Sequence, residues 1–512
     1  MNRRRFLRAG AVLGGVGVLA LAGVEVTGAA DDASGGARRR VSRSPSTAAT
    51  QAVAPATLTQ VAAPYSQAMV EENARIGTTD FNIANLGAPW SIEGYFDRAS
   101  AGFGDSVRLF VSTTAPSFQV QAYRMGWYEG LGGRLVWQSA TLPGRLQASG
   151  KVTSATNMID APWDPSTDIV INEAFVPGCY LFKLIASTGE CRFVPLTVRD
   201  DASNSAIVVI NAVTTWQAYN GWGNYSLYNG PSGFASRSRV VSFDRPYETN
   251  GAPEFLGVEL PVVRLVEKLG LDVSYLTSLD IHRAPELLTR HRAMVSLGHD
   301  EYWSKPMRDG VEHARDAGVN LLFLGANAAY RQIRLESSPL GELRHQVCYK
   351  SAGEDPITRL YPTLATSNWR DTPVNRPEAQ LLGEQYECNP VSADLVIAHP
   401  DSWVFTGTGL TQGARLPGIV GGEYDRYVAG PGIPANVEIL AHSPLNCRGR
   451  SSYADMTYYN APSGAGVIDT GTQTWNTHLD GTTPNQTIVD ITTNILLAFG
   501  KGPAATTYPA QP

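Results

Sequence analysis

The sequence predicts a multidomain protein in which an immunoglobulin-like β-sandwich precedes a doubly wound α/β domain. Short runs of alternating apolar and polar residues between 90 and 198 predict the sandwich. Continuous apolar runs that alternate with helical patterns after residue 200 predict the α/β domain. Across 512 residues we expect a signal peptide at 1–30, a disordered linker at 31–75, the sandwich at 76–200 and the α/β domain at 201–505.

The amino-terminal segment predicts export. Arg3-Arg4-Arg5-Phe6-Leu7-Arg8 precedes 16 residues, Ala9 to Val24, that are all Ala, Gly, Val or Leu. An arginine pair followed by Phe-Leu resembles a twin-arginine signal, and the apolar run is shorter than the roughly 20 residues that span a bilayer. A retained membrane anchor is the alternative. We expect a secreted or cell-envelope protein with no stable membrane insertion after signal removal.

The charge distribution excludes nucleic acid as a partner. The net charge is −6, but residues 1–45 hold eight Arg and three acidic residues, so the rest of the chain carries 33 basic and 44 acidic residues. An acidic body without basic clusters has no electrostatic footprint for a polyanion. Small neutral or cationic ligands, or a metal ion, suit it better.

The sandwich elements follow from period-two runs. Strands are expected at 106–112, 118–124, 168–171 and 180–184, separated by turns rich in Gly, Pro and Ser. Trp127 and Tyr128 follow the second of these strands, either as packing residues or as a platform for carbohydrate. Cys179 and Cys191 flank the turn at 187–189, and their closeness across a hairpin predicts a disulfide between them. The other three cysteines leave at least one odd thiol and match no zinc pattern.

The α/β elements follow from apolar runs and helix signals. Strands are expected at 206–210, 271–276, 293–297 and 319–324, and helices at 261–270, 285–289, 305–317 and 484–499. The helix at 261–270 has Pro near its start and Gly at its end, and the last helix places apolar residues on one stripe.

Polar and aromatic clusters follow several of these strands. They are 214–225 after the first strand, 298–303 after the third, 325–327 after the fourth, and 244–248 after a strand expected at 239–243. Because ligands bind beyond the carboxyl ends of strands in open α/β sheets, we expect these loops to converge on one site.

The loop at 298–301 determines which chemistry is plausible. It occupies the position of a nucleophile elbow but contains neither Ser nor Cys, so acyl transfer by a catalytic triad is not expected. His299, Asp300 and Glu301 offer a general base or metal ligands. The alternative is a structural hydrogen-bond network in which Asp300 caps the following helix.

Four motifs carry a family resemblance. They are 215–220 (TWQAYN), 242–247 (SFDRPY), 298–303 (GHDEYW) and 325–327 (GAN). Over residues 205–500 the chain resembles the carboxyl-terminal domain of the large (beta) subunit of N,N-dimethylformamidase. The resemblance implies a fold like that of class I glutamine amidotransferases, with a sandwich in front.

The resemblance also implies a site. The founding enzyme hydrolyses a small formamide at a mononuclear iron held by two tyrosines and a glutamate. Glu301 corresponds to the glutamate, Tyr219 to the first tyrosine and Tyr247 to the second, with Tyr225 and Tyr228 as competing candidates. His299 and Asn327 would act beside the metal, and we expect a substrate pocket that includes four further residues: Trp216, Asn220, Trp222 and Tyr302.

The sequence is compatible with three functions. The first is an exported hydrolase that cleaves the C–N bond of a small-molecule amide with Fe³⁺ held by Tyr219, Tyr247 and Glu301. The second is an exported protein that binds or modifies glycans, suggested by the aromatic residues near the expected pocket. The third is a non-catalytic envelope scaffold, and an oligomer is compatible with each of them.

Overall fold

The computed structural model describes residues 64–481 and 484–512. The chain separates into two units, Met1–Leu58 and Thr59–Pro512, and only the second contains described residues. The predicted signal peptide and most of the predicted linker therefore lie outside the described residues. The end of the linker range is structured, because helix α1 (Gln67–Asn73) buries three of its side chains. Ordered structure therefore begins before residue 75, inside the range predicted as linker.

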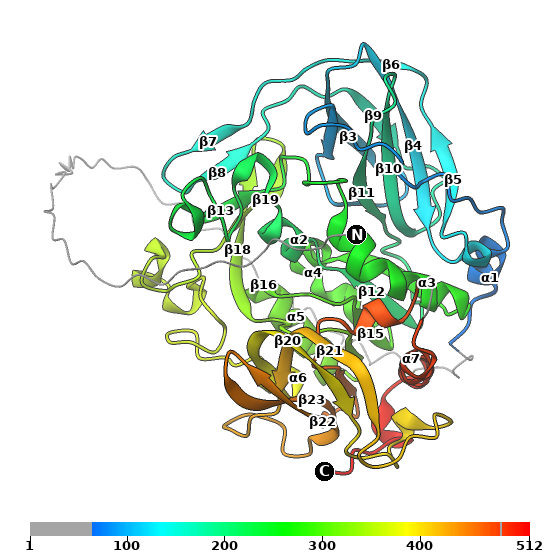
Figure 1. Ribbon diagram of the computed structural model, residues 1–512, viewed down its shortest axis with the longest axis vertical. Coiled ribbons are helices and arrows are strands. Elements are labelled where there is room, and N and C mark those ends of the chain that lie inside the picture. The colour runs from blue at the N-terminus through cyan, green and yellow to red at the C-terminus, as the bar shows by residue number, and fades with distance from the viewer. Residues whose placement is uncertain (1–63, 482–483) are drawn as a thin grey trace, which may run out of the picture. The chain divides into compact units, whose positions relative to one another are not determined.

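Residues 92–198 contain two sheets that share one apolar core (Figure 1). One sheet has the order β1-β3-β9, and the other has the order β2-β11-β10-β4-β5, with β6 beside β4. Every pair is antiparallel except β2 with β11. The bounds are β1 Ile92–Phe96, β2 Ser100–Ala101, β3 Ser106–Thr113, β4 Ser117–Met125, β5 Gly133–Gln138, β6 Leu142–Pro143, β9 Thr167–Val170, β10 Gly178–Ala186 and β11 Cys191–Val198.

The alternation read from the sequence explains this core. Val107, Leu109 and Val111 of β3 face the same core as Val120 and Ala122 of β4, while intervening polar residues are less buried. Two further strands, β7 (Lys151–Thr153) and β8 (Met158–Asp160), form a separate ribbon that reaches β13 (Val240–Ser242) (Figure 1).

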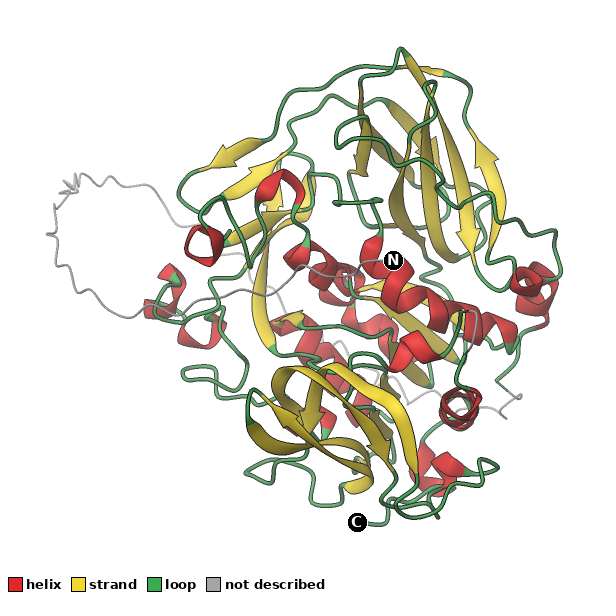
Figure 2. Cartoon of the chain, in the orientation of Figure 1, coloured by secondary structure: helices red, strands yellow, loops and turns green. Residues whose placement is uncertain are grey.

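A seven-stranded sheet forms the centre of the second half, and helices gather around it (Figure 2). Its order is β14-β12-β15-β17-β24-β23-β22. The first five strands are parallel, and the last two are antiparallel additions. The bounds are β12 Ile207–Asn211, β14 Val273–Thr277, β15 Ala293–Ser296, β17 Asn320–Phe323, β22 Glu438–Cys447, β23 Arg450–Asn460 and β24 Gly466–Asp469.

The five parallel strands follow the order 2-1-3-4-5 when numbered along the chain. This is one of the common doubly wound orders, and its topological switch point lies between the first and third strands. Here those strands are β12 and β15, which are hydrogen-bonded neighbours. The predicted parallel core is confirmed, and the topology marks the crevice beyond β12 and β15 as the expected ligand site.

Three α-helices of the described chain match the expected ranges, namely α3 Leu260–Lys268, α5 Lys305–Asp316 and α7 Gln486–Phe499. Three others were not predicted, namely α2 Val213–Tyr219, α4 Ser278–Arg283 and α6 Ala379–Leu382, and residues 285–290 form a 3-10 helix. Helix α4 begins at a capping box made by Thr277 and Asp280. Within residues 64–481 and 484–512, no helix combines the length and the apolar character needed to cross a membrane.

Much of the remaining chain is β structure that the sequence did not reveal. A four-stranded sheet has the order β13-β19-β18-β16, and β20 pairs with β21 in a long ribbon. The bounds are β16 Tyr302–Ser304, β18 Arg331–Ser338, β19 Gly341–Val347, β20 Gln385–Val396 and β21 Arg415–Arg426. The described chain is therefore a β-rich, multi-sheet protein with few helices.

A buried ion pair connects the sandwich to helix α3. Arg124 of β4 donates to both carboxylate oxygens of Glu267, at 2.7 and 3.0 Å, and neither side chain is exposed. Tyr128 also accepts a hydrogen bond from Arg124, so this aromatic residue is part of the packing rather than an exposed platform. Burial lowers the pKa of Arg124, but Glu267, Tyr128 and Tyr275 together outweigh it and hold the pKa above its usual value.

The predicted disulfide between Cys179 and Cys191 is wrong. The hairpin exists, but its register pairs Cys179 with Thr197 and Cys191 with Ile185, so the two cysteines lie at opposite ends of it. Cys179, Cys191 and Cys348 are free and buried. The disulfide joins Cys388 and Cys447 instead.

Candidate functional site

The candidate site lies at the switch point of the parallel sheet. Helix α2 follows β12 and ends at Tyr219, while the loop after β15 carries His299 and Glu301. Gly298 begins this loop with a φ of +130°, and a Cβ there would lie 2.5 Å from Val258 and 2.8 Å from Asn476. Glycine is therefore needed for the turn that presents His299 and Glu301 to the crevice, whereas Asp300 accepts a hydrogen bond from Ser296.

Two tyrosines converge on the carboxylate of Glu301. The hydroxyl of Tyr219 donates to Glu301 Oε2 at 2.6 Å. The hydroxyl of Tyr228 lies 2.9 to 3.0 Å from both carboxylate oxygens and 2.8 Å from the Tyr219 hydroxyl. The two rings stack with centroids 4.5 Å apart. We call Tyr219, Tyr228 and Glu301 the tyrosine–glutamate cluster.

Two basic side chains, Arg331 and Lys350, lie next to the cluster. Arg331 of β18 lies 3.4 Å from Glu301 Oε1. Tyr302 donates to the Tyr228 hydroxyl at 2.7 Å and itself accepts from Lys350 Nζ at 2.7 Å. Burial lowers the pKa of Lys350 to about 7, although the charge of Glu301 opposes this. Burial raises the pKa of Tyr219 well above its usual value, and the charge of Glu301 adds to the rise.

A second polar group adjoins the cluster. His299 Nε2 lies 3.6 Å from Glu301 Oε2 and 3.5 Å from Glu423 Oε2, with no closer partner among the described residues. Glu423 of β21 accepts from Asn327 at 2.6 Å and from Asn389 at 2.8 Å. Burial disfavours the imidazolium, but the carboxylates of Glu423 and Glu301 outweigh it and raise the pKa of His299 to about 9.

Asn327 is fixed by its backbone as well as its side chain. Its φ is +64°, a left-handed conformation that Asn adopts more readily than most residues. Its backbone N–H donates to both carboxylate oxygens of Asp425, at 2.8 and 3.0 Å. The predicted residue therefore lies next to His299 through a shared partner, Glu423.

Buried Arg245 shapes the loop that carries Tyr228. Its guanidinium donates to the backbone carbonyl oxygens of Asn220, Trp222 and Tyr225, and to the side chain of Gln217. Five donors in one planar group can hold several carbonyls at once, and this folds residues 220–225 back toward α2. The motif at 244–247 therefore acts on the site through Arg245.

The predicted set of metal ligands requires Tyr247 to lie beside Glu301, and the structure places its hydroxyl elsewhere. No hydrogen bond joins its hydroxyl to Glu301 or Tyr219 in the described part of the chain, and its ring packs against Trp216 with centroids 6.2 Å apart. Tyr228, named among the competing candidates, instead forms hydrogen bonds with Glu301 and Tyr219. The loop between the motifs bends back on itself, and sequence spacing alone did not show this.

The four expected pocket residues divide into two groups. Trp216 and Asn220 line a small cavity beside Tyr219, together with Tyr247. Trp222 instead packs edge-on against Trp163 of the sandwich half and donates to Glu93. Tyr302 is fully buried behind Tyr228. The aromatic residues that suggested glycan binding are thus largely used in packing.

Several residues of the site were not found from the sequence. Glu423 and Lys350 lie in segments where no motif was recognised, and Arg331 follows the 325–327 loop at the start of β18. An acidic residue beside a glycine pair at 421–422 was the available signal for Glu423, and it is weak. Their role is visible only once β18 and β21 are placed beside the parallel sheet.

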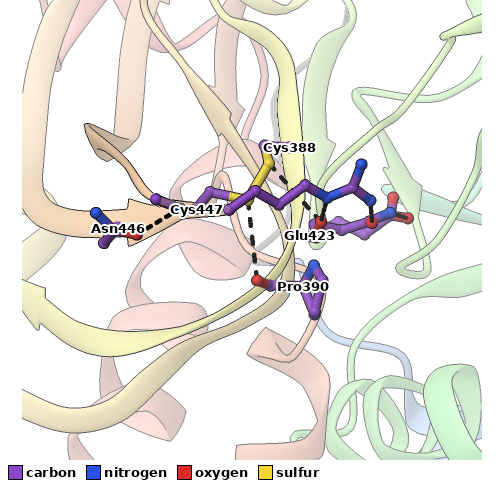
Figure 3. Close-up of a disulfide and its surroundings, with 8 residues drawn as sticks. Cys388, Pro390, Glu423, Asn446 and Cys447 are labelled. Atoms are coloured by element: carbon purple, nitrogen blue, oxygen red, sulfur yellow. Dashed lines mark hydrogen bonds between the residues drawn. A yellow bond between two sulfur atoms is a disulfide. The ribbon is translucent and has the colours of Figure 1, made fainter. Parts of the chain in front are cut away.

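The disulfide lies next to Glu423. Figure 3 shows Cys388 and Cys447 joined beside Glu423 and Pro390. Asn389 directly follows Cys388 and donates to Glu423. Arg448 in turn donates to the backbone and side-chain oxygens of Asn389. The bridge therefore restrains one end of the segment that positions Glu423.

Replacing both Cys388 and Cys447 with Ser should lower the free energy of unfolding by about 2–4 kcal/mol, because the bridge closes a loop with a sequence separation of 59. Denaturant titration measures the loss. As a control, a thiol reductant should destabilise the parent chain by a similar amount and leave the double variant unchanged. A parent chain that is fully reduced yet equally stable contradicts this expectation.

Comparison with known proteins places the chain in a family. A family model described as "N,N-dimethylformamidase beta subunit-like, C-terminal" matches residues 119–488, from β4 to α7. The N,N-dimethylformamidase beta subunit of Paracoccus aminophilus is 22% identical over 281 residues, which cover 48% of this chain and 37% of that protein. The beta subunit from Alcaligenes sp is 22% identical over 305 residues, which cover 52% of this chain and 40% of that protein.

The chain thus aligns with well under half the length of these two relatives. Among solved structures, an uncharacterized protein from Bacillus anthracis str. Ames aligns with a TM-score of 0.15 and 12% identity, covering 24% of this chain and 93% of that one, too little overlap to inform the fold. The family match spans most of the chain and contains the whole tyrosine–glutamate cluster. The chain therefore belongs to the N,N-dimethylformamidase beta subunit-like family.

Proposed function

We propose that this protein hydrolyses the C–N bond of a small-molecule amide at a mononuclear iron held by Tyr219, Tyr228 and Glu301. The observation that carries the proposal is the convergence of two phenol oxygens and a carboxylate within 2.6 to 3.0 Å at the switch point of the sheet. The relatives are named for N,N-dimethylformamide, a small amide, and the family membership supports the same reaction class here.

The residues present suit an iron ion. Phenolate and carboxylate oxygens are hard donors that match Fe³⁺, and three protein ligands leave coordination positions for water and substrate. Without a cation, burial and Glu301 hold both phenols protonated, whereas a bound cation stabilises the phenolates. Iron bound there would supply Lewis acidity toward an amide carbonyl or water.

The neighbouring residues would handle protons and substrate. His299 presents Nε2 between Glu301 and Glu423, where it can donate a proton to the departing amine nitrogen. Glu423, held by Asn327 and Asn389, keeps the imidazole oriented. The products are a carboxylic acid and an amine. Water supplies the OH group that the acyl carbon gains and the hydrogen that the amine nitrogen gains as the C–N bond breaks.

Two finer assignments belong to the same proposal. We assign the twin-arginine signal and export to residues 1–30, which would allow iron to be bound in the cytoplasm before the folded protein leaves. We also relate the sandwich to immunoglobulin-like domains and the parallel sheet to class I glutamine amidotransferases. The shared two-sheet core and the strand order 2-1-3-4-5 support these relations.

Tyr228→Phe and Tyr247→Phe form a matched pair that tests the ligand set. We expect the parent chain to hold about one iron per molecule and to show a phenolate-to-iron(III) charge-transfer band. Tyr228→Phe should shift and weaken the band and lower iron content, because one phenolate is lost, while Tyr247→Phe should leave both unchanged. Metal analysis and an absorption spectrum give the result. A parent chain that folds in iron-replete cells without binding stoichiometric metal refutes the iron assignment.

A further inference from the structure

The cavity beside Tyr219 has the composition of a cation-binding pocket. Its walls include the aromatic rings of Trp216, Tyr247 and Phe255. Trp216 contacts both other rings, with centroids 6.2 Å from Tyr247 and 6.1 Å from Phe255. The faces of aromatic rings attract organic cations through their quadrupoles, most strongly in partly desolvated sites.

Two carboxylates complete the same cavity. Glu248 and Glu254 both line it, and both are only partly exposed. Within the described residues, neither forms a salt bridge. Arg245, whose charge acts on Glu248, already donates to three backbone carbonyls. Burial raises the pKa of Glu248 and the charge of Glu254 adds to the rise, while a hydrogen bond from the backbone of Gly221 and the charge of Arg245 lower it. A bound cation would stabilise both carboxylates in their charged form.

The cavity adjoins the tyrosine–glutamate cluster through Tyr219. This residue contributes to the cavity wall, and its hydroxyl donates to Glu301. A ligand in the cavity therefore lies against one of the three residues of the cluster rather than at a remote surface.

We propose that this cavity binds the ammonium group of a cationic amide substrate, such as the formamide of a diamine, while the amide itself lies against Tyr219 and Glu301. The proposal rests on the proposed hydrolase function and names its substrate class. The carboxylates of Glu248 and Glu254 would supply the counter-charge, and the three rings would supply cation–π contacts and exclude water. A neutral dialkylformamide would leave two partly buried carboxylates facing an apolar group, which costs binding energy.

Binding is measured first, because it does not depend on catalysis. Calorimetric titration of the iron-loaded full chain compares n-butylammonium with 1-butanol, which has the same number of heavy atoms. We expect the ammonium to bind about tenfold more tightly or better. The Glu248→Gln/Glu254→Gln variant should lose this preference, and Glu173→Gln, a substitution of an exposed carboxylate in the sandwich, should retain it. Equal affinities of the parent chain for the two probes overturn the inference.

Hydrolysis is measured second, with N-(2-aminoethyl)formamide and N-propylformamide as an isosteric pair. We expect kcat/KM to be about tenfold higher for the cationic compound, and the Gln double variant to bring the two values together. Hydrolysis of both at equal kcat/KM overturns the inference and leaves the hydrolase function standing. Hydrolysis of neither, with n-butylammonium still preferred, rejects the hydrolase function and supports the pocket as a cation site.

Discussion

In the proposed hydrolase, replacing Glu301 with Gln is expected to lower the rate of amide hydrolysis, assayed with N,N-dimethylformamide, about a thousandfold or more. Glu301 is the centre of the cluster, since both tyrosine hydroxyls and the guanidinium of Arg331 contact its carboxylate. Glutamine has the same shape but no charge, and its amide group is a donor that would face the donors of Tyr219 and Tyr228. Iron would lose its carboxylate ligand, and both phenols would retain their protons. The release of dimethylamine measures the rate.

The control for this prediction is Glu336→Gln, which removes an exposed carboxylate from β18 without touching the cluster. It should keep the rate and the charge-transfer band of the parent chain. Circular dichroism and the denaturation midpoint establish that Glu301→Gln is folded. A folded Glu301→Gln chain with the iron content and rate of the parent would show that the cluster is structural and that the chemistry lies elsewhere.

Replacing Arg124 with Met should destabilise the protein by about 3–5 kcal/mol. The substitution leaves the carboxylate of Glu267 fully buried without its counter-charge, although Asn73 and Tyr275 still donate to it. It also removes two hydrogen bonds to the backbone carbonyl of Pro177. Because β4 and α3 belong to different halves of the folded region, the loss weakens their attachment. Denaturant titration followed by fluorescence measures it.

Two variants sharpen this second prediction. Arg145→Met breaks an ion pair whose side chains are 64% and 66% exposed, so it should change stability by less than about 1 kcal/mol. Arg124→Met/Glu267→Leu removes both buried charges and should be less destabilised than the sum of its single variants. An Arg124→Met chain within about 1 kcal/mol of the parent would mean that the buried pair does not join the two halves.

The parallel sheet was predictable because its strands are buried on both faces. The run 206–210 is continuously apolar, and 319–324 is apolar apart from Asn320. The helices between such runs leave few ways to connect the strands other than in parallel. The ribbon of β20 and β21 lacked such a signal. Its residues are mostly partly exposed, and its register shifts in several places, so neither a steady alternation nor an apolar run marks it in the sequence.

The site was predictable where its residues follow strands closely. Tyr219 and Glu301 come soon after β12 and β15, whose adjacency the topology requires. Tyr228 and Glu423 depend on longer excursions of the chain. Tyr228 reaches the cluster because Arg245 folds its loop back, and Glu423 because β21 packs beside the sheet. The disulfide was mispredicted for a related reason, since a hairpin turn does not specify which residues face each other.

By itself, the sequence determined the order of the two architectures, the parallel core and the family motifs, because these depend on local periodicity and short-range turns. The tertiary structure decided which tyrosine joins Glu301, which cysteines pair, and that the carboxylates of Glu248 and Glu254 line an aromatic cavity beside the cluster. Those features depend on strand register and on contacts between residues far apart in the sequence. The local sequence allows several conformations of each loop, and single side chains such as Arg245 determine which one forms.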